Sequence, residues 1–150
     1  MKAYADTSFL ASLYITGDAH HAAAARIMES WQGTPRLPLT PFGMIELLNV
    51  LSRLQFKGKM HAAEAQVSET LVRQDLATGV LESKPLRAYE WMQTAQGIVR
   101  NITPLTGTRT LDMLHLAIAR LNDAKTILSF DKNQRLAAKA AGFALLPASI

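Results

Sequence analysis

Two acidic residues follow short apolar segments that have the composition of β-strands. Asp6 comes directly after the expected strand Lys2–Ala5, and Asp131 comes directly after the expected strand Thr126–Phe130. In open parallel sheets, ligands bind beyond the carboxyl ends of the strands, so these two carboxylates can meet there although they are far apart in sequence. Each aspartate taken alone is also explained as a helix N-cap, where a negative charge suits the helix dipole.

Glu46 and Asp112 lie in the first turns of two further expected helices. Glu46 falls on the side away from the apolar stripe of its helix, so a solvated polar face is the alternative interpretation, and Asp112 also complements a helix dipole. Both helices are expected to begin at the same edge of the sheet as the other two acids. Four converging carboxylates would repel one another, and a hard divalent cation with oxygen ligands offsets that repulsion. Mg²⁺ is the expected ion, with Mn²⁺ as the alternative.

Other groups that could do chemistry form weaker patterns. His20 and His21 are adjacent on an expected helix, so their side chains point about 100° apart and cannot chelate one ion together. His115 lies three residues after Asp112, where it either hydrogen-bonds an acid or fills the edge of the core. The chain contains no nucleophile elbow around a serine, no phosphate-binding loop and no dinucleotide glycine fingerprint, which argues against ATP and NAD chemistry.

The composition indicates a globular domain. The 150 residues fit one domain, and 49% apolar against 19% charged residues excludes a disordered chain. Zero cysteines exclude disulfides, thiolate metal sites and a cysteine nucleophile. The apolar runs are too short for a membrane-spanning helix and no secretory signal is recognisable, so a cytoplasmic protein is expected. The formal net charge of +4 is compatible with a polyanionic partner and proves none.

Short apolar runs alternate with longer segments of helical periodicity, and this alternation predicts an α/β domain with a parallel sheet. Strands are expected at Lys2–Ala5, Leu37–Leu39, Val80–Glu82, Thr126–Phe130 and Phe143–Leu146. Helices are expected at Thr7–Ile15, Ala19–Trp31, Pro41–Phe56, His61–Ala77, Arg87–Arg100, Thr110–Asn122 and Lys132–Ala141, with a turn at 103–107. Thr40 and Pro41 supply an N-cap and a first-turn proline, and the apolar residues that follow at helical spacing predict a core-facing stripe.

Four sequence blocks, taken in order, resemble the PIN-domain nucleases, and most of all the VapC-type toxins of prokaryotic toxin-antitoxin pairs. The blocks are Ala5–Leu10, the Glu46 helix after Leu-Pro-Leu-Thr-Pro, Arg109–Ala117, and Ser129–Lys132 leading to Ala140-Ala141-Gly142. Together they cover essentially the whole chain. The resemblance implies one nuclease domain over residues 1–150, built as a three-layer α/β/α sandwich around a central parallel sheet.

The resemblance also assigns roles to single residues. It implies a catalytic and metal-binding quartet formed by Asp6, Glu46, Asp112 and Asp131. Ser8 and Ser129 match the small hydroxyl positions that support the first and last of these acids, and His115 lies in the third block. Metal-assisted hydrolysis of a phosphodiester needs no side-chain nucleophile. We expect the first and third acids of the quartet to be the most direct ligands, the other two to support them or orient water, and Arg109 to contact a phosphate.

The resemblance finally implies partners: an RNA substrate, a cognate antitoxin protein and a second copy of the chain in a homodimer. Two alternatives remain open from the sequence. One is a free-standing PIN-type nuclease that serves RNA processing or DNA metabolism. The other is a catalytically inactive PIN-fold domain that binds protein partners through its acidic crevice.

Overall fold

Seven helices and five strands form in residues 2–150, the part of the chain that this computed structural model describes. The strands are β1 (Ala3–Ala5), β2 (Leu37–Leu39), β3 (Leu81–Ser83), β4 (Thr126–Leu128) and β5 (Ala144–Leu146). The helices are α1 (Thr7–Tyr14), α2 (His21–Glu29), α3 (Pro41–Phe56), α4 (Ala62–Thr78), α5 (Ala88–Thr106), α6 (Thr110–Leu121) and α7 (Lys132–Ala140).

The elements fall into two compact units. Residues 2–6 and 86–150 form one, named here the terminal unit, and residues 7–85 form the other, the central unit. The expectation of one nuclease domain over residues 1–150 stays a prediction.

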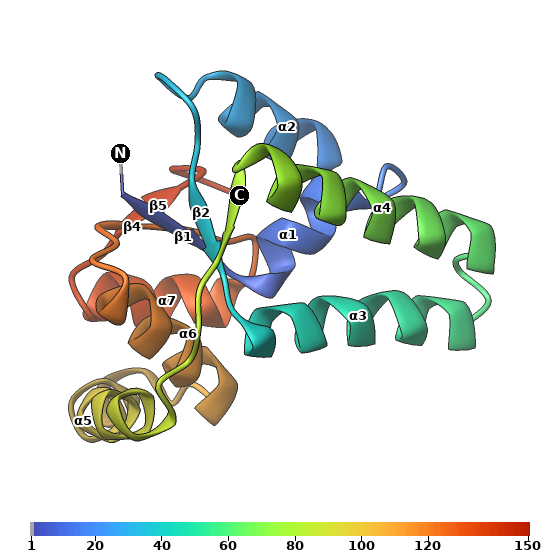
Figure 1. Cartoon of the computed structure of the whole chain (residues 1–150). Helices are drawn as coiled ribbons and strands as arrows, with labels where there is room; N and C mark the ends of the chain where they lie inside the picture. The colour runs from blue at the N-terminus through green and yellow to red at the C-terminus, as the bar shows by residue number, and fades with distance from the viewer. Residues whose placement is uncertain (1) are drawn as a thin grey trace. The chain divides into compact units, whose positions relative to one another are not determined.

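The terminal unit is built on a parallel sheet in the order β1-β4-β5. All residues of β1 and β4 are buried, as is usual for strands of a parallel sheet. Helices α5, α6 and α7 pack against one another, and α7 packs against β5. In Figure 1, α6 and α7 lie below the sheet, and α5 lies below them. The first residue after β1 and the first turns of α6 and α7 all belong to this unit.

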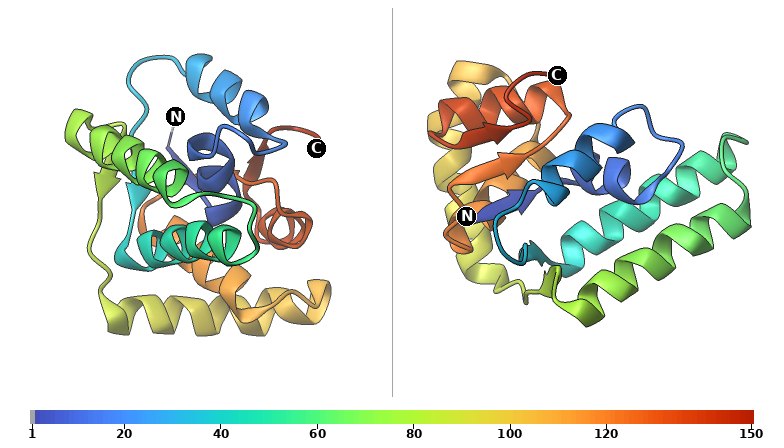
Figure 2. Two further views of the ribbon diagram at one scale, coloured as in Figure 1. Left: turned by 90° about the vertical axis from the view of Figure 1, so that its right-hand side faces the viewer. Right: turned by 90° about the horizontal axis from the view of Figure 1, so that it is seen from above.

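The central unit contains the parallel pair β2-β3 and a pair of long helices. Helices α3 and α4 lie side by side and run in opposite directions (Figure 2). Helix α1 packs against α2, α3 and α4. As predicted, α3 begins at Pro41, and the Thr40 side chain caps it by accepting a hydrogen bond from the backbone N–H of Gly43.

The predicted ends of α5 and β4 were wrong, and α2 is two residues shorter at each end than the predicted helix Ala19–Trp31. Helix α5 does not end at Arg100 with a turn at 103–107, but continues to Thr106. Pro104 lies near the end of the helix and lacks the N–H for one helical hydrogen bond, but the helix continues past it, and the Gly107 N–H donates to the Thr103 carbonyl at its end. Strand β4 ends at Leu128, so two residues separate it from Asp131.

None of the helices in residues 2–150 is long and apolar enough to cross a membrane.

Candidate active site

Asp6 is held at the end of β1 by main-chain and side-chain contacts. Its backbone N–H donates to the carbonyl of Leu128 at 3.1 Å, which carries the pairing of the two strands one residue further. The Asp6 side chain is only 3% exposed, and its Oδ2 accepts a hydrogen bond from the hydroxyl of Ser129 at 2.5 Å. Ser129 is fully buried. The fold therefore fixes this carboxylate in place before any ligand binds.

The same hydroxyl connects Asp6 with Asp131. Ser129 Oγ accepts a hydrogen bond from the backbone N–H of Asp131 at 3.1 Å while it donates to Asp6. Asp131 Oδ1 in turn accepts from the backbone N–H groups of Asn133 and Gln134, at 2.7 and 2.8 Å. Asp131 is thus an N-cap of α7, as the alternative interpretation held. The Ser129 hydroxyl also connects its backbone N–H to the Asp6 carboxylate.

Asp112 lies in the first turn of α6 and is half-buried. Its Oδ2 accepts a hydrogen bond from the backbone N–H of Arg109 at 3.1 Å. Burial raises the pKa of the Asp112 carboxyl above its usual range; the hydrogen bond from Arg109 opposes that rise, and the negative charge of Asp131 adds to it. Electrostatic interactions with His115 and Arg109 lower the pKa of Asp112 by smaller amounts. Asp112 and Asp131 therefore sense each other's charge.

Gln134 joins these two acids and was not singled out from the sequence. Its side-chain Nε2 donates to the main-chain carbonyl of Asp112 at 3.3 Å, and its backbone N–H donates to Asp131. The side chain is 1% exposed. A signal was present, because Gln134 precedes the buried Ala137 and Ala138 by three and four residues and so lies on the buried face of α7.

Arg135 was also missed. It is 9% exposed, and its guanidinium donates to the carbonyl of Ser129 at 3.0 Å and to that of Ala148 at 3.2 Å. The planar guanidinium presents several N–H groups at once and can therefore bind two carbonyls. Arg135 ties the segment before Asp131 to the end of the chain.

Three further predicted residues have local roles. The Nδ1 of His115 shares a hydrogen bond of 2.7 Å with the hydroxyl of Tyr4, and both residues are buried, so His115 joins α6 to β1. Arg109 is exposed and is the N-cap residue of α6. Ser8 is half-buried in the first turn of α1.

Glu46 belongs to the central unit, on α3. It is half-buried, and its Oε2 accepts a hydrogen bond from the hydroxyl of Thr7 at 2.7 Å. Thr7 directly follows Asp6 in the chain. Glu46 therefore lies on a partly solvated face and makes a hydrogen bond within the central unit, and its role as a site residue stays a prediction.

The donor set suits a hard divalent cation. In residues 2–150, no three His, Asp or Glu side chains are close enough to hold an ion together as they stand. Mg²⁺ does not require such a cage, because it usually keeps several waters and binds one or two carboxylates. The buried Asp6 and the half-buried Asp112 supply carboxylate oxygens, and hydrogen bonds to both carboxyl groups restrict their movement. The residues present fit magnesium or manganese.

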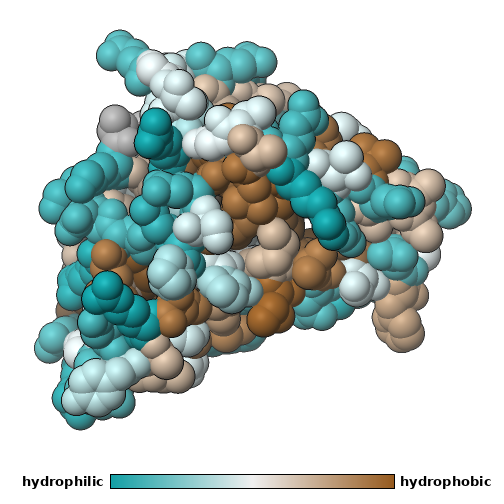
Figure 3. All heavy atoms as spheres, in the orientation of Figure 1, coloured by the Kyte–Doolittle hydropathy of each residue, from teal (hydrophilic) through white to brown (hydrophobic). Residues whose placement is uncertain are grey.

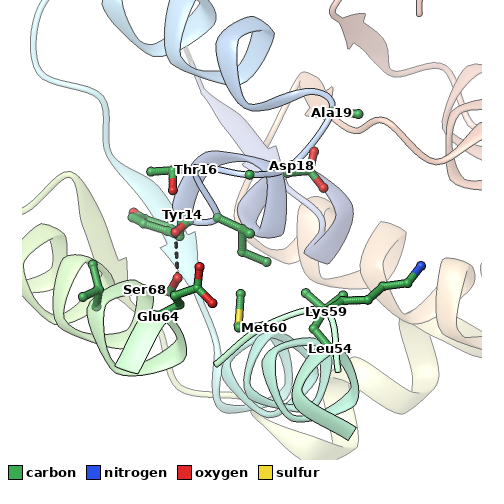
Figure 4. A pocket seen from close by; sticks show the side chains of 12 residues that line it. Tyr14, Thr16, Asp18, Ala19, Leu54, Lys59, Met60, Glu64 and Ser68 are labelled. Carbon is green, nitrogen blue, oxygen red and sulfur yellow. Dashed lines mark hydrogen bonds between the residues drawn. The ribbon is translucent and has the colours of Figure 1, made fainter. Parts of the chain in front are cut away.

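The central unit carries two hollows that none of the four acids lines. One, of about 460 Å³, lies among α1, α4 and the segment after α3, and Figure 4 shows its labelled side chains. At this hollow, burial and a hydrogen bond to Asp75 raise the pKa of the Tyr14 hydroxyl, so Tyr14 stays protonated. The other is an apolar groove of about 310 Å³ between α3 and α4, where brown surface gathers in Figure 3. These hollows are separate from the predicted chemistry.

Comparison with known proteins identifies the fold. A model of the PIN domain family matches residues 3–140. The structure of VapC20 from Mycobacterium tuberculosis, described as a toxin that cleaves the sarcin-ricin loop, has 23% sequence identity and a TM-score of 0.69 over 94% of this chain and 95% of that chain. PAE2754 from Pyrobaculum aerophilum has 14% identity and a TM-score of 0.54 over 97% and 90%. The curated proteins include no significant match. These results confirm the expected fold class.

Proposed function

This chain belongs to the PIN domain family, and we propose that it is a metal-dependent ribonuclease, the toxin of a toxin-antitoxin pair. The observation that carries the proposal is the Ser129 hydroxyl, which donates to the Asp6 carboxylate and accepts from the Asp131 backbone. It joins two of the four predicted acids through one buried group. The similarity to VapC20, described as a toxin that cleaves the sarcin-ricin loop, supports RNA as the substrate class.

We propose different roles for the four acids because their environments differ. Asp6 is buried and fixed by Ser129, and partial burial raises the pKa of the Asp112 carboxyl, so we propose these two as the direct ligands. Asp131 and Glu46 are proposed to hold or orient water molecules. When bound, Mg²⁺ supplies a Lewis acid that stabilises the negative charge developing on the phosphate. Arg109, exposed at the start of α6, is proposed to contact a phosphate of the RNA.

We further propose that the chain acts in the cytoplasm, where its RNA substrate is found, as a homodimer that a cognate antitoxin inhibits. If the acids bind a divalent cation, a positively charged side chain can compete with that cation for them. An Arg or Lys of the antitoxin is therefore expected to approach the acids.

The test is cleavage of RNA by the homogeneous protein with Mg²⁺, with Mn²⁺ and with excess chelator. We expect cleavage with either metal and none with chelator. Asp6→Asn is expected to abolish it, whereas Asp123→Asn is the matched control. Asp123 is exposed, pairs with Lys2 at 3.3 Å and has a positive φ of 55°, which asparagine accepts readily. Undiminished cleavage in chelator contradicts the proposal.

A further inference from the structure

Gln134 contacts both acids at the start of their helices. Its Nε2 donates to the main-chain carbonyl of Asp112, in the first turn of α6, and its backbone N–H donates to the carboxylate of Asp131, the N-cap of α7. Gln134 is 1% exposed, and both bonds are part-buried. Gln134 therefore connects α7 to α6 near the first turns, where Asp131 and Asp112 lie.

The other end of the same amide is unsatisfied. Gln134 Oε1 is buried and has no hydrogen-bond partner among the described residues. A buried carbonyl oxygen without a donor lowers the stability of the folded state. A methionine has nearly the same length and volume and would fill the space without that cost. Packing alone therefore does not explain an amide at this position, whereas its bond to the Asp112 carbonyl does.

We propose that Gln134 is a positioning residue that holds Asp112 and Asp131 at the separation required by a divalent cation. This inference rests on the proposed function of the site. Outer residues that orient metal-binding groups affect metal affinity by typically 10- to 100-fold, although they do not touch the ion. The separation of the two acids depends on how α7 packs against α6. The side chain of Gln134 makes a hydrogen bond between the first turns of those two helices.

The test compares Gln134→Met with the parent protein by calorimetric titration of Mn²⁺ and Mg²⁺ and by thermal unfolding with and without metal. We expect a 10- to 100-fold loss of metal affinity. The Tm of the metal-free protein should stay the same or rise, because the variant removes a buried oxygen that has no donor. Gln96→Met is the matched control, since Gln96 lies on the exposed surface of α5, and it should leave both quantities unchanged.

A purely structural role gives the opposite pattern: a lower metal-free Tm and parental metal affinity, which overturns the inference. If Gln134→Met does not fold, Gln134→Asn keeps the amide but is one methylene shorter and cannot reach the Asp112 carbonyl. The same loss of affinity is then expected, and parental affinity overturns the inference. The two proposals fail differently. A parent protein that binds neither metal defeats the proposed function, whereas a parent that binds and variants that match it defeat the role of Gln134 alone.

Discussion

At Asp6, charge and hydrogen bonding can be separated by a single substitution. The carboxylate accepts a hydrogen bond from Ser129 in a buried position, and an asparagine oxygen can accept the same bond. Only the negative charge is lost. Stability and metal response should therefore change in different directions, which distinguishes a ligand from a residue that is only structural.

Asp6→Asn should leave the metal-free protein equally or more stable, because one charge is removed from an acidic site. Added Mg²⁺ raises the Tm of a protein that binds it in the folded state, and this increase should be much smaller in the variant. Cleavage should fall at least about 100-fold, since a metal contributes several kcal/mol and each 1.36 kcal/mol is a factor of ten. Thermal unfolding with and without Mg²⁺ and RNA cleavage are the measurements. A parental Mg²⁺ response together with parental cleavage would remove Asp6 from the site.

Asp112 predicts how metal binding depends on pH. Burial raises the pKa of this carboxyl in the folded protein, so the stability contributed by its neutral form is present at low pH and is lost as the pH rises through the raised pKa. Asp112→Asn should therefore make the metal-free protein more stable at neutral pH, and the difference should vanish near pH 3. Protons also compete with the cation, so the parent's affinity for Mn²⁺ should weaken as the pH falls from 7 toward the raised pKa. Urea unfolding and Mn²⁺ titration across this range check both statements; a pH-independent difference contradicts the first.

At the scale of elements, the short segment between β4 and α7 connects two residues of the proposed site, Asp6 and Asp131. It lies beyond Leu128, the last residue of β4, but its backbone stays bonded to the sheet, because the N–H of Ser129 donates to the carbonyl of Leu146 at 3.1 Å. The Ser129 hydroxyl donates to the Asp6 carboxylate and accepts from the Asp131 backbone N–H, and the Ser129 carbonyl accepts from Arg135. A change at Arg135 therefore acts on the acids through the position of Ser129.

Arg135→Met should destabilise the protein by about 3–6 kcal/mol, because a hydrogen bond from a charged group contributes about 1.5–3 kcal/mol and the variant removes two. Arg135→Lys should recover only part of this, since one ammonium cannot replace the planar guanidinium. Arg120→Met is the control. Arg120 is exposed and makes one long bond of 3.4 Å to the Ala141 carbonyl, so its loss should cost less than about 0.5 kcal/mol. Urea unfolding measures all three, and equal losses at the two positions would contradict the assignment.

At the scale of the whole molecule, membership of the PIN domain family supports the proposed nuclease activity, and VapC20 shares the fold. The net charge of +4 suits a polyanionic substrate, although the site itself is acidic. A divalent cation bound at the proposed site would offset the negative charge of the acids.

Expression of this chain in a bacterial host should slow growth, and co-expression of a small protein encoded beside it should restore growth. The Asp6→Asn variant should be harmless, while Asp123→Asn should be as toxic as the parent. Replacing the Arg or Lys of the antitoxin that approaches the acids by Ala should weaken inhibition, because a charged hydrogen-bonding partner is lost. Growth curves and a binding titration test this. Toxicity without any neighbouring gene product that binds would favour the free-standing nuclease.

Interactions within a few residues could be read from the amino-acid order. The Thr40-Pro41 start of α3 was predicted correctly because caps depend on neighbours in the first turn. The placement of Asp6 just after β1 was predicted because apolar runs and their ends are local signals. The end of α5 was not, since one proline weakens a helix near its end without preventing another turn.

Contacts between distant segments were decided by the tertiary structure. Ser129 and Asp6 are 123 positions apart, and only the parallel pairing of β1 and β4 brings the hydroxyl to the carboxylate. The resemblance named Ser129 as a supporting residue, but the bridge to the Asp131 backbone depends on where β4 ends. In the sequence, the residue type of Gln134 does not distinguish it from other polar residues. In the structure it is buried and bonded to α6. Sequence periodicity predicts which face of a helix is buried, whereas the partner of a buried polar group depends on which element packs against that face.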